Sequence, residues 1–309
     1  FDCESLEKII LENSQGINTE FKRVFHGRGG CFEGFEFLTI DSIDKILYVV
    51  FFSEVEPHLE EKLLQLFFKL YESNRWSCVI LQKRYILKEA SVILHGELPV
   101  ESYVIESGLK YNLNLLSSRN IGFFGDMKNG RDFIRDNCKE KKVLNLFSYT
   151  CAFSIAALEG GATSVVNVDM SKGALSIGRA NHHLNNLPTK QIQFMPYNIL
   201  KSWNRIKKVG PYDVIIIDPP TFQKGSFVVT NDYDKIVKKL DSLSSENCLI
   251  LSSTNSPDVD SKYIVDIFTT HAPLFKFINR LDNLETYPAL NADRSLKNLI
   301  FIKEKNNSI

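Results

Sequence analysis

An acid and two prolines follow a predicted buried strand in the segment IDPPTF, residues 217–222. The apolar run Asp213–Ile217 predicts that strand, and proline cannot donate a hydrogen bond to a sheet. The strand must therefore end in a stiff corner whose carbonyl groups are free of the ladder. Asp218 and those carbonyls can accept hydrogen bonds from a planar nitrogen heterocycle, and Phe222 can stack on its face. A simple turn that ends a strand is the alternative interpretation.

A second candidate segment is NLFSYTCAFS, residues 145–154, between the predicted strand Lys142–Phe147 and the predicted helix Ala152–Glu159. Small and hydroxylic residues at the start of a helix leave backbone N–H groups that can point at a ligand. The segment lacks the GxGxxG glycines with which dinucleotide enzymes approach a pyrophosphate. It therefore favours a ligand without a pyrophosphate.

Two further strand ends carry polar side chains. Asp169 follows the predicted strand Ser164–Val168, where a carboxylate can accept both hydroxyls of an adenosine ribose; a helix N-cap in the segment DMSK is the alternative. Asn198 follows the next predicted strand and can bind the adenine edge or serve only as a polar turn residue. A nucleoside without a pyrophosphate fits S-adenosylmethionine (SAM) better than ATP or NAD.

These residues depend on the elements that position them. From about residue 119 onward, strands and helices alternate, which predicts a doubly wound, mostly parallel sheet with helices on both faces. Ligands of such sheets bind at the carboxyl ends of the strands. The residues before this point predict a smaller α+β domain, with strands at Phe35–Asp41 and 45–54 and an amphipathic helix at His58–Tyr71. We therefore expect two domains, 1–118 for substrate recognition and 119–309 for SAM binding.

Composition limits the classes of function. The 309 residues include 37 basic and 37 acidic side chains, so any binding of nucleic acid must depend on a local patch. One candidate is HGRGG, residues 26–30, where Arg28 lies in a glycine loop near Phe25 and Phe32. The basic runs KEKK (139–142) and RIKK (205–208) are others. A glycine turn and ordinary solvated surface are the alternatives.

Other counts bear on location and metals. The six cysteines are scattered, which is typical of a reducing, cytoplasmic environment without disulfides. No apolar run approaches the roughly 20 residues that span a bilayer, and we see no secretory signal. No spacing of cysteine and histidine predicts a metal site.

Taken together, these motifs resemble the class I SAM-dependent methyltransferases that modify large-subunit ribosomal RNA. They are most similar to the branch that methylates guanine N7 in 23S rRNA, in which NLFSYT, VDMS and DPPTF recur. The similarity covers roughly Glu106–Ser226 well and the rest of the chain weakly. It implies a Rossmann-like domain with a seven-stranded sheet, bound SAM and an RNA substrate.

The resemblance also assigns roles by position. The Asp218 corner becomes the target-base loop, and the segment before the Rossmann-like domain becomes the rim near SAM or substrate. Cys151 stands where the family usually has glycine, and Asn198 where an acid is common; we expect the Cys151 side chain to lie close to the methionine part of SAM. The target-base residues are Asp218, Pro219, Pro220 and Phe222, the cofactor residues are Asn145, Phe147, Ser148, Tyr149, Thr150, Asp169, Met170 and Asn198, and the rim residues are Asp126, Lys128 and Arg131.

A related branch methylates cytosine C5, which requires a cysteine thiolate to add to the ring. Its cysteine follows the fifth strand or lies in the proline loop, where this chain has LSSTNSP and Pro220; Cys248 lies inside a predicted strand. Guanine N7 has an exposed lone pair and needs positioning rather than a general base. We therefore expect transfer without a covalent intermediate. A methyltransferase for proteins or small molecules, and an RNA-binding protein of this fold that has lost catalysis, are the alternatives.

Overall fold

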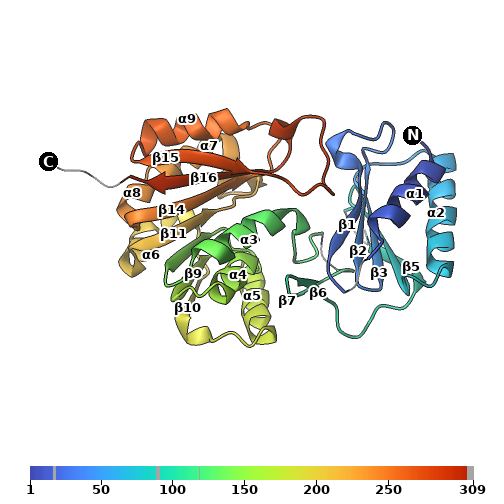
Figure 1. Cartoon of the computed structure of the whole chain (residues 1–309), viewed down its shortest axis with the longest axis horizontal. Coiled ribbons are helices and arrows are strands. Elements are labelled where there is room, and N and C mark those ends of the chain that lie inside the picture. The colour runs from blue at the N-terminus through green and yellow to red at the C-terminus, as the bar shows by residue number, and fades with distance from the viewer. Residues whose placement is uncertain (17–18, 88–90, 118, 305–309) are drawn as a thin grey trace. The chain divides into compact units, whose positions relative to one another are not determined.

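The computed structural model describes the chain except residues 17–18, 88–90, 118 and 305–309 (Figure 1). The chain forms two compact units. The first consists of residues 1–125 and 284–290, and the second of residues 126–283 and 291–309. The later segment of the first unit comes from the loop between the last two strands of the second. The domain boundary at 118/119, and substrate recognition by the first domain, stay predictions.

The first unit is built on a five-stranded sheet in the order β1-β2-β3-β4-β5. Helices α1 and α2 lie on one face of it (Figure 1) and share an apolar core with the strands. Strands β3 and β4 are parallel, and the other neighbouring pairs are antiparallel. The elements are α1 (Cys3–Asn13), β1 (Lys22–His26), β2 (Leu38–Ile43), β3 (Ile46–Phe51), α2 (Pro57–Glu72), β4 (Cys78–Lys83), β5 (Ser91–Gly96) and the hairpin β6 (Tyr103–Glu106) and β7 (Leu109–Asn112).

Helix α2 forms for reasons that its sequence shows. Pro57 lies in its first turn, where no N–H donor is needed, and Glu56 Oε2 accepts the Leu59 N–H at 3.0 Å. Its buried side chains recur at helical spacing and are Leu63, Leu66, Phe67 and Leu70. The predicted helix is confirmed and is one residue longer at each end. Strands β1 and β5 were not predicted, because their sequences lack a clear alternation.

The second unit is built on a seven-stranded sheet in the order β10-β9-β8-β11-β14-β16-β15. The five strands from β10 to β14 are parallel, and β16 runs antiparallel to both of its neighbours. The predicted class I fold with a mostly parallel sheet is confirmed. The strands are β8 (Lys142–Leu146), β9 (Ser164–Val168), β10 (Ile192–Met195), β11 (Tyr212–Ile217), β14 (Ser244–Thr254), β15 (Phe275–Leu281) and β16 (Lys297–Lys303).

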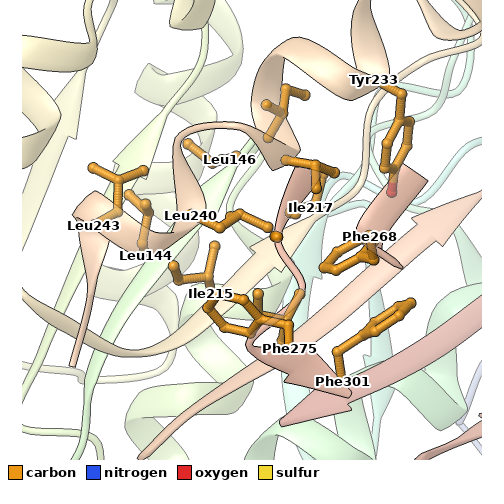
Figure 2. Close-up of a cluster of buried hydrophobic side chains, with 14 of the residues drawn as sticks. Leu144, Leu146, Ile215, Ile217, Tyr233, Leu240, Leu243, Phe268, Phe275 and Phe301 are labelled. Carbon is orange, nitrogen blue, oxygen red and sulfur yellow. The ribbon is translucent and has the colours of Figure 1, made fainter. Parts of the chain in front are cut away.

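Helices cover both faces of this sheet because its central strands are apolar on both sides. In β11, Ile215 and Ile217 pack into one core with α6 to α9, as Figure 2 shows for part of that core. Val214 and Ile216 alternate with them and pack into a second core with α3 and α4. The helices are α3 (Lys128–Asn137), α4 (Ala152–Glu159), α5 (Lys172–Leu184), α6 (Trp203–Val209), α7 (Val229–Val237), α8 (Leu240–Leu243) and α9 (Ser261–His271).

The structure corrects the expected elements at the end of the chain. The sequence predicts one helix at 232–243 and a strand at Cys248–Ser252, but the structure has two separate helices, α7 and α8, in the first range. The predicted strand Cys248–Ser252 is the centre of the longer β14. Helix α9 and strands β15 and β16 had not been placed in the sequence.

Lys297, the first residue of β16, is a fully buried amine. Its Nζ donates to the carbonyl oxygens of Ser256 at 2.9 Å, Asp293 at 2.7 Å and Ser295 at 2.8 Å. Burial lowers its pKa to about 8, with a further contribution from Arg280. The amine therefore keeps its charge at pH 7, and all three of its protons have acceptors. It connects the chain after β14 to the chain before β16.

We predict that Lys297→Met destabilises the protein by about 3 kcal/mol, because three buried carbonyl groups lose their donor. Urea unfolding at pH 7 measures this change. The matched control is Lys276→Met, because Lys276 is exposed and its pair with Glu304 is long, at 3.9 Å; a change of less than about 0.5 kcal/mol is expected there. Equal stability of the two variants would contradict the structural role of Lys297.

Candidate active site

An open pocket, with about 240 Å³ of space that includes solvent at its mouth, lies at the carboxyl ends of the central strands of the second unit. This edge, where β8 lies between β9 and β11, is the place where open parallel sheets bind ligands. The structure brings four of the predicted cofactor residues to this one pocket. The residues that line it are Phe147, Asp169, Met170, Asn198, Ile199, Leu200, Gln223 and Ser226.

The loop after β8 has an unusual backbone. Phe147, Tyr149 and Cys151 have left-handed φ values of 57°, 48° and 65°, which cost about 1 kcal/mol or more in residues other than glycine. The loop is held to the next strand end, because the Ser148 N–H donates to the Val168 carbonyl at 3.1 Å. Bonds to neighbouring loops thus hold the strained backbone in place.

Asp169 connects this loop to helix α5. One carboxylate oxygen accepts the Tyr149 N–H at 2.9 Å and the other accepts the Ser171 N–H at 2.8 Å. The N-cap of α5 is Ser171, whose Oγ accepts the Ala174 N–H at 3.1 Å, so the cap does not require Asp169. Burial raises the pKa of Asp169, although both backbone bonds oppose that shift. Each oxygen keeps acceptor capacity on the pocket side.

The other predicted cofactor residues occupy different environments. Ser148 Oγ is buried and has no hydrogen-bond partner among the described residues. Met170 is 40% exposed at the pocket rim. Asn198 precedes the short turn Ile199–Lys201, and its side chain makes no capping bond there. Thr150 is buried, and its carbonyl accepts from Asn181 Nδ2 at 3.1 Å.

Asn145 lies in a buried polar network behind the loop and is not among the described residues that line the pocket. Its Nδ2 donates to Asn167 Oδ1 at 2.9 Å, and Asn167 Nδ2 donates to Ser154 Oγ at 3.0 Å. Ser154 Oγ is 2.8 Å from His182 Nε2. Burial lowers the pKa of His182 to about 4. The network contributes rigidity between β8, β9, α4 and α5.

The structure shows what Cys151 packs against, whereas its distance from the methionine part of SAM stays a prediction. Its thiol is fully buried and faces helix α5: a Cβ atom on Gly178 would lie 2.4 Å from Cys151 Sγ. Burial raises the pKa of this thiol. The left-handed φ explains why a glycine suits this position. The missing side chain at Gly178 makes room for the cysteine.

The predicted target-base corner leads into a small hairpin that the sequence did not indicate. Strand β12 (Phe222–Gln223) pairs with β13 (Phe227–Val228). Phe222 is 64% exposed, whereas Phe227 is buried with its ring edge against Phe147 at 5.0 Å. Gln223 and Ser226 of the same hairpin line the pocket. In the sequence, the only signal for Gln223 and Ser226 as pocket residues is that Gln223 follows the DPPTF motif. Strands of two residues have no periodic pattern that would predict the hairpin.

Asp218 directly follows the last residue of β11 and is partly buried. Of the two prolines after it, Pro219 is buried and Pro220 is exposed. Burial raises the pKa of Asp218 to about 7, and the nearby charge of Asp126 adds to this effect, while Arg131 opposes it. Two of the three predicted rim residues thus act electrostatically on Asp218. The third, Lys128, pairs instead with Asp132 along α3.

Each of the two basic runs has one side chain in a contact within the second unit. Lys142 of KEKK donates to the Val209 carbonyl. Arg205 of RIKK lies over the Tyr197 ring, 4.6 Å from its centroid.

In the described part of the chain, no three His, Cys, Asp or Glu side chains form a group that could hold a metal ion. Among the same residues, no helix combines the length and the apolar character that crossing a bilayer requires.

Comparison with known proteins gives one family match. Residues 22–302 match the model of a family described as S-adenosylmethionine-dependent methyltransferase. A protein of Aeromonas salmonicida named ribosomal RNA large subunit methyltransferase I is 36% identical over 195 residues, which are 62% of this chain and 49% of that protein. A protein of the same name from Vibrio vulnificus is 28% identical over 271 residues, 83% of this chain and 68% of that protein. The chain thus spans about half the length of the first of these relatives.

Among solved structures, the crystal structure of the methyltransferase SMU.776 complexed with SAH is similar to this chain, with a TM-score of 0.85 and 25% identity. The match covers 98% of this chain and 82% of the other. A SAM-dependent methyltransferase from Streptococcus mutans gives a TM-score of 0.86 at 23% identity over the same shares, which shows the fold alone.

The contact between Cys151 and Gly178 predicts a compensating pair of substitutions. Gly178→Ala should destabilise the protein by about 2 kcal/mol, because the new methyl group would overlap Cys151 Sγ. Combining it with Cys151→Gly should remove most of that loss, since the overlapping atoms are gone. Thermal and urea unfolding of the four proteins give the coupling energy. Additive effects would show that the two residues do not meet.

The raised pKa of Asp218 predicts a pH dependence of stability. The folded pKa of about 7 is above the unfolded value of about 4. Stability from this group is therefore fully present below the unfolded pKa and is lost as pH rises through about 7. Asp218→Asn should remove this loss, which we expect to be on the order of 2 kcal/mol for a partly exposed carboxyl. Urea unfolding of both proteins at pH 5 and pH 8 tests this prediction. An equal change in the free energy of unfolding between the two pH values in both proteins would contradict it.

Proposed function

Because this chain belongs to the S-adenosylmethionine-dependent methyltransferase family, we propose that it transfers a methyl group from SAM to a ring or exocyclic nitrogen of a base in large-subunit ribosomal RNA. Guanine N7 is the atom we favour. The relatives from Aeromonas salmonicida and Vibrio vulnificus are named for that class of RNA, and the motif pattern is most similar to the guanine-N7 branch. We also propose substrate recognition by the first domain.

The pocket fits the adenosine part of SAM. Asp169 lines the pocket and has acceptor capacity for the ribose hydroxyls. Asn198 can bind the adenine edge, and Ile199 and Leu200 provide an apolar wall. No phosphate cradle is needed. Bound SAM would supply a methyl group on a positively charged sulfur.

One observation carries the proposal: the base corner and the nucleoside pocket share one structural element. The chain from Asp218 runs directly into the β12–β13 hairpin, whose Gln223 and Ser226 line the pocket. Phe222, on the same hairpin, exposes its ring to solvent, where a flat base could stack. Fixing donor and acceptor on one hairpin provides the positioning that methyl transfer requires.

The three cysteines of the second unit are all buried, which argues for direct transfer. A covalent mechanism needs an accessible thiolate. Cys248 is fully buried within β14, and burial raises the pKa of its thiol. Cys151 is also buried. Asp218 can instead orient the base, because an ionised carboxylate accepts hydrogen bonds from N–H groups on the Watson–Crick edge of guanine.

The test is transfer of labelled methyl from SAM to 23S rRNA from a strain that lacks the modification, followed by nucleoside mass spectrometry. We expect one methylated guanine. The rate should rise as pH increases through about 7, where Asp218 ionises. Asp218→Asn should lower the rate on the order of 100-fold and remove that pH dependence. Asp169→Ala should weaken SAM binding in calorimetry by roughly tenfold or more.

Two controls sharpen this experiment. Asp136→Asn removes an exposed carboxylate from α3 and should change neither rate nor SAM binding. Phe222→Leu keeps an apolar side chain but loses the ring face, and should raise the KM for RNA without changing SAM affinity. Binding of SAM without transfer to any RNA would refute the proposed substrate. Absence of SAM binding would refute the enzymatic role.

A further inference from the structure

Two arginines of the first unit lie over one aromatic ring, and the charge of a third acts on one of them. The guanidinium carbon of Arg28 lies 4.4 Å from the Phe52 centroid, and that of Arg84 lies 5.3 Å from it. Arg119 is close enough for its charge to act on Arg84, whose Nη2 donates to Asn120 Oδ1 at 2.8 Å. We call Arg28, Arg84, Arg119 and Phe52 the arginine cluster.

The cluster forms at one edge of the five-stranded sheet. Strands β1, β3 and β4 run in the same direction, because β1 and β3 are both antiparallel to β2 and β4 is parallel to β3. Arg28, Phe52 and Arg84 each follow the carboxyl end of one of these strands. The sheet thus brings together charges that are distant in the sequence.

The charges of the cluster have no acidic partner among the described residues, unlike their neighbours. Arg23 forms an ion pair with Asp41 at 2.5 Å, and Lys83, adjacent to Arg84, pairs with Glu60. Burial and the positive charges of Arg119 and Arg28 lower the pKa of Arg84. Like charges held together without a counter-charge repel one another, and a bound anion would relieve that repulsion.

The turn that carries Arg28 is rigid, which differs from the flexible loop expected from HGRGG. It is a short 3₁₀ turn, Gly27–Gly29, with glycines at the points of closest approach. A Cβ on Gly27 would lie 1.8 Å from the Phe35 carbonyl oxygen, and one on Gly29 would lie 1.8 Å from that of Pro288. The Leu290 N–H donates to the Gly29 carbonyl at 2.9 Å. Arg28 is therefore preorganised.

The aromatic partner of Arg28 also differs from the expectation. Phe25 and Phe32 pack with tilted rings, 4.8 Å between their centroids, and belong to the apolar core region with Phe35. The ring that the Arg28 guanidinium contacts is that of Phe52, and the Arg84 guanidinium contacts the same ring. One ring thus contacts two planar guanidinium groups. Arg28 is exposed, and Arg84 has further N–H donors besides the one that binds Asn120.

From this geometry we infer that the arginine cluster binds the phosphate backbone of the RNA substrate. The inference rests on the proposed function, since it names the surface that would hold that substrate. Guanidinium forks match phosphate oxygens in bidentate geometry. Several cations at the carboxyl ends of neighbouring strands can contact successive phosphates of one RNA chain, which a single small anion does not offer. Because the whole protein has no net charge, a local cluster of this kind is what RNA binding requires.

The experiment measures binding of the full chain to protein-free 23S rRNA transcript at salt concentrations between about 50 and 200 mM. The Arg28→Ala/Arg84→Ala double variant should bind roughly tenfold more weakly, and its slope of log K against log salt should be smaller by about 1.5. Arg28→Lys keeps the charge but loses the fork, so its affinity should lie between those of the wild type and the double variant. Wild-type affinity and slope in the double variant would overturn the inference.

Arg75→Ala is the matched control. Arg75 lies in the same unit, before rather than after β4, and its guanidinium carbon is 5.4 Å from the Trp76 centroid. The Arg75→Ala substitution removes one charge and one cation–π contact at the opposite end of β4, and should leave RNA affinity unchanged. If the double variant does not fold, Arg119→Ala replaces it, because Arg119 is exposed; its slope should fall by about 0.7.

Other outcomes separate this inference from the proposed function. If wild-type protein binds SAM but transfers no methyl group to rRNA, the proposed function fails. If it methylates rRNA and the cluster variants do so with unchanged KM, only the inference on the cluster fails. Polyglutamate is the competitor that tests for an acidic protein partner. Displacement of RNA by polyglutamate at equal charge, dependent on Arg28 and Arg84, would overturn the assignment to RNA.

Discussion

The candidate site depends on one carboxylate that holds two loops together. Asp169 accepts backbone N–H groups from Tyr149, in the loop after β8, and from Ser171, at the start of α5. These bonds use only part of its acceptor capacity, so the same group can hold a ligand and shape the pocket. The loop it holds contains three left-handed residues other than glycine, a conformation that persists only where surrounding contacts enforce it.

The contacts behind the loop provide that enforcement. The buried network from Asn145 to His182 connects two strands and two helices through side-chain hydrogen bonds. Cys151 packs its thiol against the bare backbone of Gly178. Buried polar groups that are mutually satisfied favour one arrangement over its neighbours. The pocket is therefore rigid on the side of β8 and β9, while the β12–β13 hairpin covers it from β11.

Charge is distributed unevenly in this neutral chain. Near the sheet of the second unit, Asp126 lies close enough to Asp218 to raise the pKa of Asp218, and Arg131 opposes that effect. In the first unit, the arginine cluster gathers positive charges without an acid among the described residues. The neutral total thus conceals one local site where acids lie close together and another where arginines do.

The sequence by itself determined the parallel sheet, helix α2, and the strand ends that carry Phe147, Asp169 and Asn198, because apolar periodicity and turn residues are local signals. It also indicated the Asp218 corner, since proline cannot donate to the hydrogen-bond ladder of a central strand. Only the tertiary structure decided that Asn145 lies behind the loop, that Cys151 faces Gly178, that Gln223 lines the pocket, and that Arg28 meets Arg84 over Phe52. These contacts join residues from separate elements, so they depend on how strands pair and helices pack, which no local pattern specifies.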